Sequence, residues 1–289
     1  MASERRFMAQ RERKLPMAQI YYLESDTACS TTDGTRLFVS LEVQLIPRKY
    51  YNETNQILVV DASSRRWKRF ALPLDQRGHC MEWHAGLLYV AGGIVPGLAG
   101  GEGPLSYLDS LRAYNEATGS WEDLPPMPHA MAPYASGVIG NRLFIAGGEC
   151  QSEGVLSTTL LIYDIATRTW ELGPPLPVDP DRREIPSRGV VVDEKLFVLL
   201  FSSRSMLVYD PHSESWAEEA APPNRDIWAH SCVHNGRLVD ISRELIGDRW
   251  DRSLQHVMFE RTTDGSWSRC EFDGTGLGYA YVAESVLLG

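Results

Sequence analysis

Tyr163-Asp164-Ile165-Ala166-Thr167-Arg168-Thr169-Trp170 is the stretch that decides the fold. It reads as the end of one β-strand at Tyr-Asp, a polar turn, and a second strand that begins at Trp. Related stretches elsewhere have the same order of an apolar residue, a polar turn and a tryptophan: Tyr114 to Trp121, Tyr209 to Trp216, Val60 to Trp67 and Phe259 to Trp267. Because the pattern recurs along the chain, the sequence predicts a repeat architecture with one structural unit per copy.

Each unit is predicted to contain four antiparallel strands, A to D in chain order. The third unit is the clearest: residues 135–139 form strand A, and Gly140-Asn141 suits the hairpin turn that follows. Strand B covers 143–148, strand C covers 160–164, and Trp170 begins strand D. Prolines then end the unit, because proline cannot continue a strand ladder.

An apolar strand, a Gly-Gly pair, and then Tyr and Trp at a fixed spacing together resemble the kelch repeat. Two units carry the whole motif, with Gly92-Gly93 and Gly147-Gly148, and three carry it in part. The motif tryptophans follow one another at intervals of 46 to 54 residues. The resemblance covers about residues 17–289 and implies a β-propeller, in which radially stacked blades bury both faces of each sheet.

Segments near the two ends of the chain are predicted to close the ring. Residues 278–283 and 285–289 look like strands A and B of a sixth unit, and residues 6–10 and 19–23 are candidates for its remaining strands. We therefore predict an all-β, six-bladed propeller of kelch type whose last blade is closed by strands from both termini. Residues 1–16 would form an N-terminal segment that contributes a closing strand, and 17–289 the propeller. Five blades with a loose tail is the alternative.

Composition argues against several classes of protein. The net charge of −10 and the pI of about 5.2 disfavour nucleic-acid binding, which needs a basic surface. No apolar run approaches the roughly 20 residues that cross a bilayer, and the charged N-terminus lacks the apolar core of a signal peptide. The five cysteines are odd in number and widely spaced, which predicts reduced thiols and a cytoplasmic location.

Sequence motifs for catalysis or metal binding are not found. There is no Gly-x-Ser-x-Gly elbow, and no Gly-Lys-Ser/Thr follows the glycine pairs. His230, Cys232 and His234 share one face of a predicted strand, but the two histidines would lie roughly 13 Å apart, too far to bind one ion. We therefore expect no catalytic residue, metal or cofactor, and we assign the glycine pairs and motif aromatics to packing between blades.

The B–C connections are the segments that vary most between units. They cover about 43–55, 94–109, 149–158, 202–205 and 243–252, whereas the A–B and C–D turns are short. Insertions in repeat proteins collect on one face, which is often the binding face, and the D–A connections lie at the same end. Arginine and aromatic residues are enriched at binding hot spots. Our candidate partner-binding residues there are Arg77, His79, Tyr134, Arg188, Arg204, Arg225, Trp228, His230 and Tyr279.

The resemblance also implies a function. In kelch adaptors, arginines at such positions hold acidic peptides through charge-assisted hydrogen bonds. We expect a monomeric, noncatalytic adaptor or scaffold that recognises a protein or peptide, with acidic segments as the favoured kind, and that binds neither nucleic acid nor membranes. The alternative is a small-molecule-binding protein, or an isomerase- or lyase-type enzyme, with its site at the central channel.

Overall fold

The computed structural model describes residues 13–14, 30–33, 35–41, 56–61, 66–74, 76–95, 106–150, 156–179, 186–200, 205–223, 230–234, 236–246 and 253–270. All regular secondary structure in these ranges is β-strand. These ranges therefore hold no helix that could cross a membrane. The all-β prediction is confirmed.

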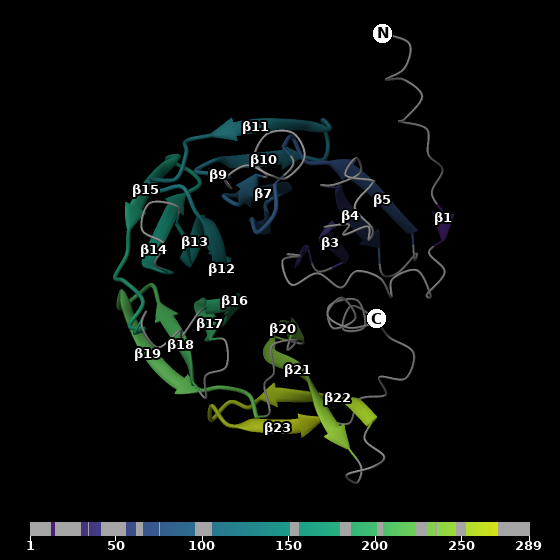
Figure 1. Ribbon diagram of the computed structural model, residues 1–289, viewed down its shortest axis with the longest axis vertical. Helices are drawn as coiled ribbons and strands as arrows, with labels where there is room; N and C mark the ends of the chain where they lie inside the picture. Colours follow the sequence, from purple (N-terminus) through teal and green to yellow (C-terminus); the bar gives the residue numbers. More distant parts are fainter. Residues whose placement is uncertain are drawn as a thin grey trace.

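Five antiparallel sheets stand around a common axis, and each is one blade of a propeller (Figure 1). Within each blade the strands follow the chain from the axis outward, as the repeat predicts. The strands of blades one and two are β2 (Ser30–Thr32), β3 (Arg36–Leu41), β4 (Gln56–Asp61) and β5 (Arg66–Ala71), then β6 (Cys80–His84), β7 (Leu87–Ala91), β10 (Leu111–Asn115) and β11 (Ser120–Leu124). Blades three to five contain β12 (Ala132–Ile139), β13 (Arg142–Glu149), β14 (Leu156–Asp164) and β15 (Thr169–Leu172), then β16 (Pro186–Val192), β17 (Lys195–Leu200), β18 (Ser205–Asp210) and β19 (Ser215–Ala220), and finally β20 (His230–His234), β21 (Arg237–Ile246), β22 (Ser253–Arg261) and β23 (Trp267–Cys270).

The N-terminal strand β1 (Arg13–Lys14) differs from the expectation for this part of the chain. It pairs with β5, the outermost strand of blade one, with Arg13 opposite Trp67. The N-terminal segment is predicted to complete a sixth blade, but β1 instead adds a fifth strand to the outer edge of the first. An outer edge offers unpaired backbone groups, which explains why so short a strand can pair there. The segments expected to form a sixth blade lie outside the described residues.

The apolar core is divided into layers between neighbouring blades. Blades two and three share a layer that contains Tyr89 and Ile145, and blades three and four share one that contains Phe144 and Leu207. Further layers lie between blades one and two and between blades four and five. Blades two, three and four thus have an apolar face on both sides, and stacking around the axis removes these faces from water.

The motif tryptophans tie each blade to the one before it. Tyr163 lies directly opposite Trp170 in the β14–β15 pair, with ring centroids 4.9 Å apart. The indole N–H of Trp170 donates to the Pro125 carbonyl of blade two at 2.9 Å. Three other motif tryptophans make the same bond to the segment that ends the preceding blade: Trp121 to Ala71, Trp216 to Pro174 and Trp267 to Ala220. The predicted role of these aromatics in packing between blades is therefore confirmed for these units.

The glycine pairs bring the backbones of two blades together. A Cβ on Gly92, whose φ is +64°, would lie 2.5 Å from the Met131 carbonyl oxygen at the start of blade three. Its neighbour Gly93 donates its N–H to that same carbonyl at 2.8 Å. In blade three, a Cβ on Gly147, whose φ is +68°, would lie 3.1 Å from Pro186 Cγ at the start of blade four. Only glycine fits such positions, so the pairs serve packing rather than phosphate binding.

Candidate functional site

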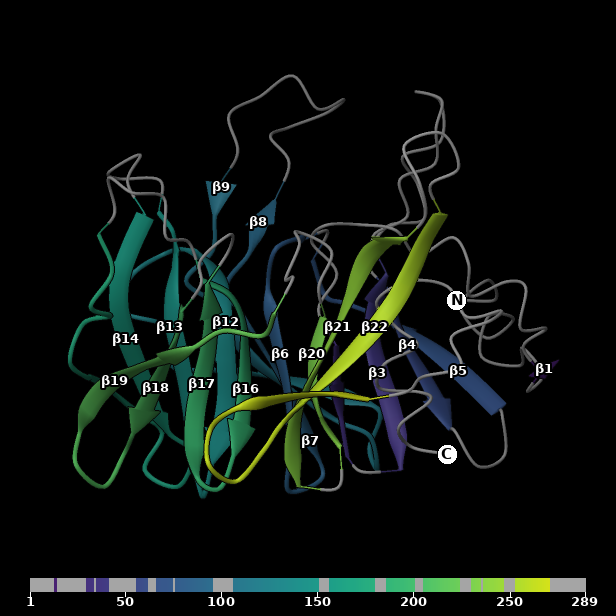
Figure 2. The ribbon, with the colours of Figure 1, turned by 90° about the horizontal axis from the view of Figure 1, so that it is seen from below.

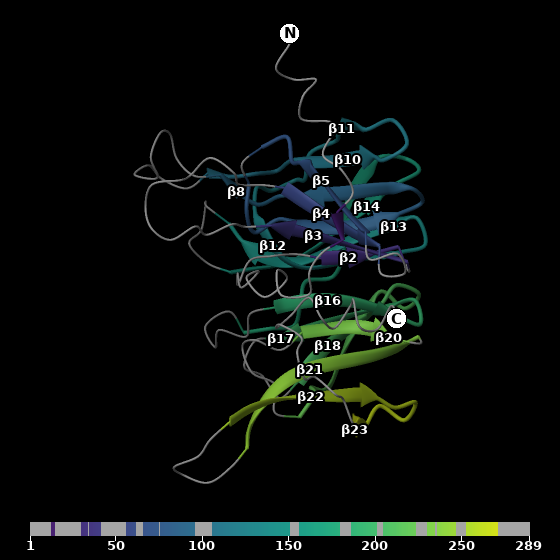
Figure 3. The same cartoon turned by 90° about the vertical axis from the view of Figure 1, so that its right-hand side faces the viewer.

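At one end of the ring, which we call the loop end, the second strand of each of the five blades ends and the third strand begins. The segment 94–109, which the sequence predicts to be a loop, includes a two-stranded hairpin of β8 (Ile94–Val95) and β9 (Ser106–Tyr107). These strands are too short for a sequence pattern to reveal. The hairpin stands beyond the blades at the loop end (Figure 2), and β8 projects there in the side view as well (Figure 3).

Backbone hydrogen bonds fasten the base of this hairpin to the rim. Arg77, in the D–A connection that precedes blade two, donates its N–H to the Ile94 carbonyl at 2.9 Å and accepts from the Ile94 N–H at 2.7 Å. Leu108 donates to the Gly93 carbonyl at 2.8 Å on the returning side. The Arg77 side chain is exposed. The hairpin base is thus a fixed part of the loop end, with an arginine beside it.

Two tyrosines and a glutamate meet beside the hairpin. Burial raises the pKa of Tyr107 to about 12, and a hydrogen bond to Glu149 at the end of β13 adds to the shift. Burial likewise raises the pKa of Tyr134, on β12, to about 12, and the negative charge of Glu149 adds to it. Both tyrosines are half-buried. Both phenols therefore stay protonated at neutral pH and can donate hydrogen bonds.

His79 lies beneath this surface and not on it. Its side chain is 3% exposed, and a Cβ on Gly93 would lie 3.2 Å from its own Cβ. Burial lowers the pKa of His79 to about 4. The expectation that His79 faces a partner is thus corrected, because the neutral ring supports the loop end from inside.

The remaining candidate residues fall in different places. Arg188 lies on β16 and faces the axis of the ring, so it does not join Arg77 and Tyr134 at the rim. His230 is the first residue of β20, at the loop end of blade five. Arg204, Arg225, Trp228 and Tyr279 lie outside the described residues.

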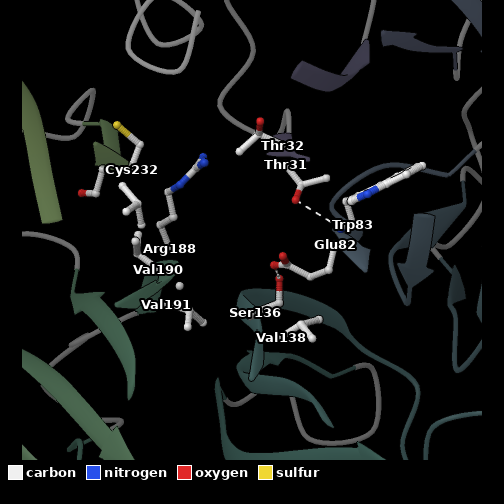
Figure 4. A pocket seen from close by; sticks show the side chains of 14 residues that line it. Thr31, Thr32, Glu82, Trp83, Ser136, Val138, Arg188, Val190, Val191 and Cys232 are labelled. Atoms are coloured by element: carbon white, nitrogen blue, oxygen red, sulfur yellow. Dashed lines mark hydrogen bonds between the residues drawn. The ribbon is translucent and has the colours of Figure 1, made fainter. Parts of the chain in front are cut away.

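A cavity of about 190 Å³ lies on the axis, lined by residues from the innermost strands of the five blades and open on one side. Arg188 extends into it from β16, and the Glu82 carboxylate lies across the cavity on the side of β6 (Figure 4). Ser136 of β12 donates to Glu82 at 2.6 Å. The polar lining residues are Thr31, Thr32, Glu82, Ser136, Arg188 and Ser231.

Sequence reasoning missed most of these polar residues, because the cavity draws a few from each of five distant units. One signal was present: Glu82 is a charged residue within a short strand A, Cys80-Met81-Glu82-Trp83-His84. Period-two alternation places it on one face of its sheet but does not say which residues of other blades it meets. In the described ranges, no three His, Cys, Asp or Glu side chains are grouped closely enough to hold a metal ion.

The sequence of this chain is similar to those of kelch proteins. The family model described as Kelch motif matches residues 77–128 and 130–177, which cover blades two and three. Kelch-like protein 34 of Homo sapiens is 22% identical over 256 residues, covering 81% of this chain and 38% of that protein. Kelch-like protein 40 of Xenopus tropicalis is 31% identical over 134 residues, covering 45% of this chain and 20% of that protein. The chain thus spans less than half the length of these curated relatives.

A solved structure described as "Structure of YjhT" has a similar fold. The two superpose with a TM-score of 0.60 at 15% sequence identity, over 85% of this chain and 83% of that one. At this identity the likeness concerns the fold alone. Together with the motif matches and the radial sheets, it confirms the predicted kelch-type propeller, while the predicted number of six blades stays a prediction.

Proposed function

Because this chain carries kelch repeats arranged as propeller blades, we propose that it is a noncatalytic recognition module that binds a partner protein or peptide at the loop end. The observation that carries the proposal is the β8–β9 hairpin, which stands beyond the blades yet is fastened to the rim through Arg77 and Ile94. A projecting element with a fixed base can contact a partner without being ordered first, which lowers the entropic cost of binding.

The chemistry of the rim supports the same role. Tyr107 and Tyr134 offer aromatic surface and protonated hydroxyl groups, and the exposed Arg77, whose backbone pairs with Ile94 at the hairpin base, offers a guanidinium at the same rim. Tyrosine and arginine are enriched at interface hot spots, since each combines a large contact area with directional hydrogen bonds. The arginine favours an acidic segment in the partner, because carboxylates accept its paired N–H groups.

An adaptor or scaffold role in the cytoplasm follows as part of this proposal. Relatives named Kelch-like protein 34 and Kelch-like protein 40 match this chain over part of their length. Four cysteines in the described ranges are thiols rather than disulfides, which favours a reducing compartment: Cys80, Cys150, Cys232 and Cys270. The propeller would then present its partner to other proteins of the same assembly.

Affinity capture with defined variants tests the loop end. The Arg77→Ala/Tyr134→Ala protein is compared with the wild type and with Arg142→Ala, a control at the start of β13 near the opposite end of the ring. Proteins captured by the wild type and by Arg142→Ala, but depleted at least about tenfold by the double variant, are the expected result. Each such protein is then purified and its Kd measured.

Equal Kd values for the wild type and the folded double variant would rule out the loop end as the binding surface. Circular dichroism of both variants checks that the blades are intact. Truncating Tyr107 as well, in a folded triple variant, should weaken binding further, because Tyr107 lies on the hairpin itself.

A further inference from the structure

The axial cavity has features that partner binding at the loop end does not use. Its lining residues come from the middle of the inner strands and from the positions before the A–B turns, such as Val138 and Val233. It is therefore deeper than the rim that carries Tyr107 and Arg77. Both an arginine, Arg188, and a glutamate, Glu82, line this cavity.

The two charged groups belong to different blades and face the same space. Arg188 reaches the cavity from blade four and Glu82 from blade two (Figure 4). A guanidinium carries five N–H donors in a fork, and a carboxylate offers about four lone-pair sites. Each group can therefore hold a ligand in addition to its protein contacts. Facing charges of opposite sign suit a ligand that is itself dipolar.

The hydroxyl groups around the cavity are oriented by their protein partners. Ser136 gives its only proton to Glu82 at 2.6 Å, and Ser231 gives its proton to the buried Asp240 at 2.5 Å. Thr32 likewise donates to the Arg36 carbonyl at 2.8 Å. These three oxygens consequently present lone pairs and no proton to the cavity. The Glu82 carboxylate and the Ser136 oxygen can therefore accept a hydrogen bond from a ligand, whereas Thr31, which accepts from the Trp83 N–H at 3.2 Å, keeps a proton that it can donate.

Size narrows the class of ligand further. The cavity of about 190 Å³ equals the share of liquid volume of about six water molecules. Pockets for drug-sized ligands measure roughly 300–1,000 Å³. A molecule of about three carbon atoms with polar groups at both ends fits within this volume.

We propose that the axial cavity binds a small molecule that carries a carboxylate and, beside it, a hydrogen-bond donor that is a hydroxyl or an ammonium group. The carboxylate pairs with the Arg188 guanidinium, and the donor points to Glu82 and Ser136. This site is separate from the loop end and does not depend on the function proposed there.

Four probes of similar size test both ends of the ligand. Glycerate and serine each join a carboxylate to donors, glycerol lacks the carboxylate, and propionate lacks the donors. Isothermal titration calorimetry on the full chain at low salt is expected to show saturable binding of glycerate or serine, with Kd about tenfold or more weaker for glycerol and propionate. The tighter of the two acids identifies the donor as hydroxyl or ammonium.

Two variants place the ligand within the cavity. Arg188→Gln is expected to raise the Kd of the bound acid about tenfold or more, because the charge-assisted pair is lost. Glu82→Met removes the acceptor and should raise the Kd of the acid about fivefold or more, without raising the Kd of propionate. Arg77→Gln, an arginine variant at the rim, should leave the Kd unchanged.

The proposal is overturned if neither acid binds saturably, or if a folded Arg188→Gln protein binds the acid as tightly as the wild type. Should both variants fail to fold, amide chemical shifts of the wild type decide, since saturable shifts at Ser136 and Gly189 are expected and their absence would refute the site. The loop-end variant Arg77→Ala/Tyr134→Ala should still bind the acid, and Arg188→Gln should still capture the protein partner, so the two proposals fail independently.

Discussion

Replacing Gly92 with alanine should destabilise the propeller through one backbone contact. Gly92 has a φ of +64°, and a Cβ there would lie 2.5 Å from the Met131 carbonyl oxygen and 2.8 Å from Pro133 Cδ. Neither atom is the free end of a flexible side chain. The start of blade three must therefore shift away from blade two to admit the methyl group.

Gly140 provides a matched control for this substitution. Its φ is +57°, but a Cβ there would meet nothing within 4 Å. Gly140→Ala therefore carries only the left-handed backbone strain of roughly 1–2 kcal/mol, less the gain of roughly 0.4–1 kcal/mol from a stiffer unfolded chain. Gly92→Ala adds overpacking of roughly 1–3 kcal/mol. We expect the free energy of unfolding to fall by about 1 kcal/mol in Gly140→Ala and by about 2–4 kcal/mol in Gly92→Ala.

Thermal unfolding measured by circular dichroism separates these values. With an unfolding entropy of roughly 2.1 cal/mol/K per residue, a 289-residue chain loses about 1.6 °C of Tm per kcal/mol. The expected drops in Tm are about 2 °C for Gly140→Ala and about 3–7 °C for Gly92→Ala. Equal drops in the two variants would show that the close approach of the blades at Gly92 is not a constraint, and would refute the packing role of the glycine pair.

Two further predictions concern stability. Trp170→Phe keeps an aromatic ring beside Tyr163 but removes the N–H bonded to the Pro125 carbonyl. The free energy of unfolding in urea should therefore fall by about 0.5–1.5 kcal/mol. An unchanged free energy of unfolding would refute the contribution of this bond between blades. The pKa of His79 is lowered by burial to about 4, so from pH 6.5 down to pH 4 the unfolded chain binds a proton that the folded chain does not. The free energy of unfolding should therefore fall by about 3 kcal/mol in total as the pH drops through this window. His79→Leu should remove this part of the pH dependence, as measured by urea unfolding. An unchanged pH profile in His79→Leu would contradict the role of His79.

The repeat spacing was sufficient to predict the blades, because it directly encodes strand pairing. A seven-residue step from Tyr163 to Trp170 places the two residues opposite each other across a tight turn, and the same register joins Tyr114 to Trp121 and Tyr209 to Trp216. In blade five the step is eight residues and Arg261, not Phe259, lies opposite Trp267. The indole bond to the preceding blade is kept even so.

The sites were harder to predict, because they combine residues that have no local relation in the sequence. Alternation places Arg188 on a face of its strand, but only the packing of five blades shows that this residue and Glu82 line one cavity on the axis. The place of His79 in a D–A connection predicts a position at the rim, yet the close approach of Gly93 encloses it. The hairpin β8–β9 has two residues per strand, too few for any periodic pattern.

The indole bonds between blades mean that each blade is fastened only after the next blade has been synthesised. Each tryptophan belongs to the last strand of its blade but holds the exit of the blade that was synthesised before it, as Trp216 holds Pro174. During translation, the exit of a given blade therefore stays unfastened until 42 to 50 more residues have been synthesised, because its partner indole has not yet been made. Nascent chains arrested just before and just after Trp216 should thus differ in how readily a protease cuts at residues 173–177, with protection appearing one blade late.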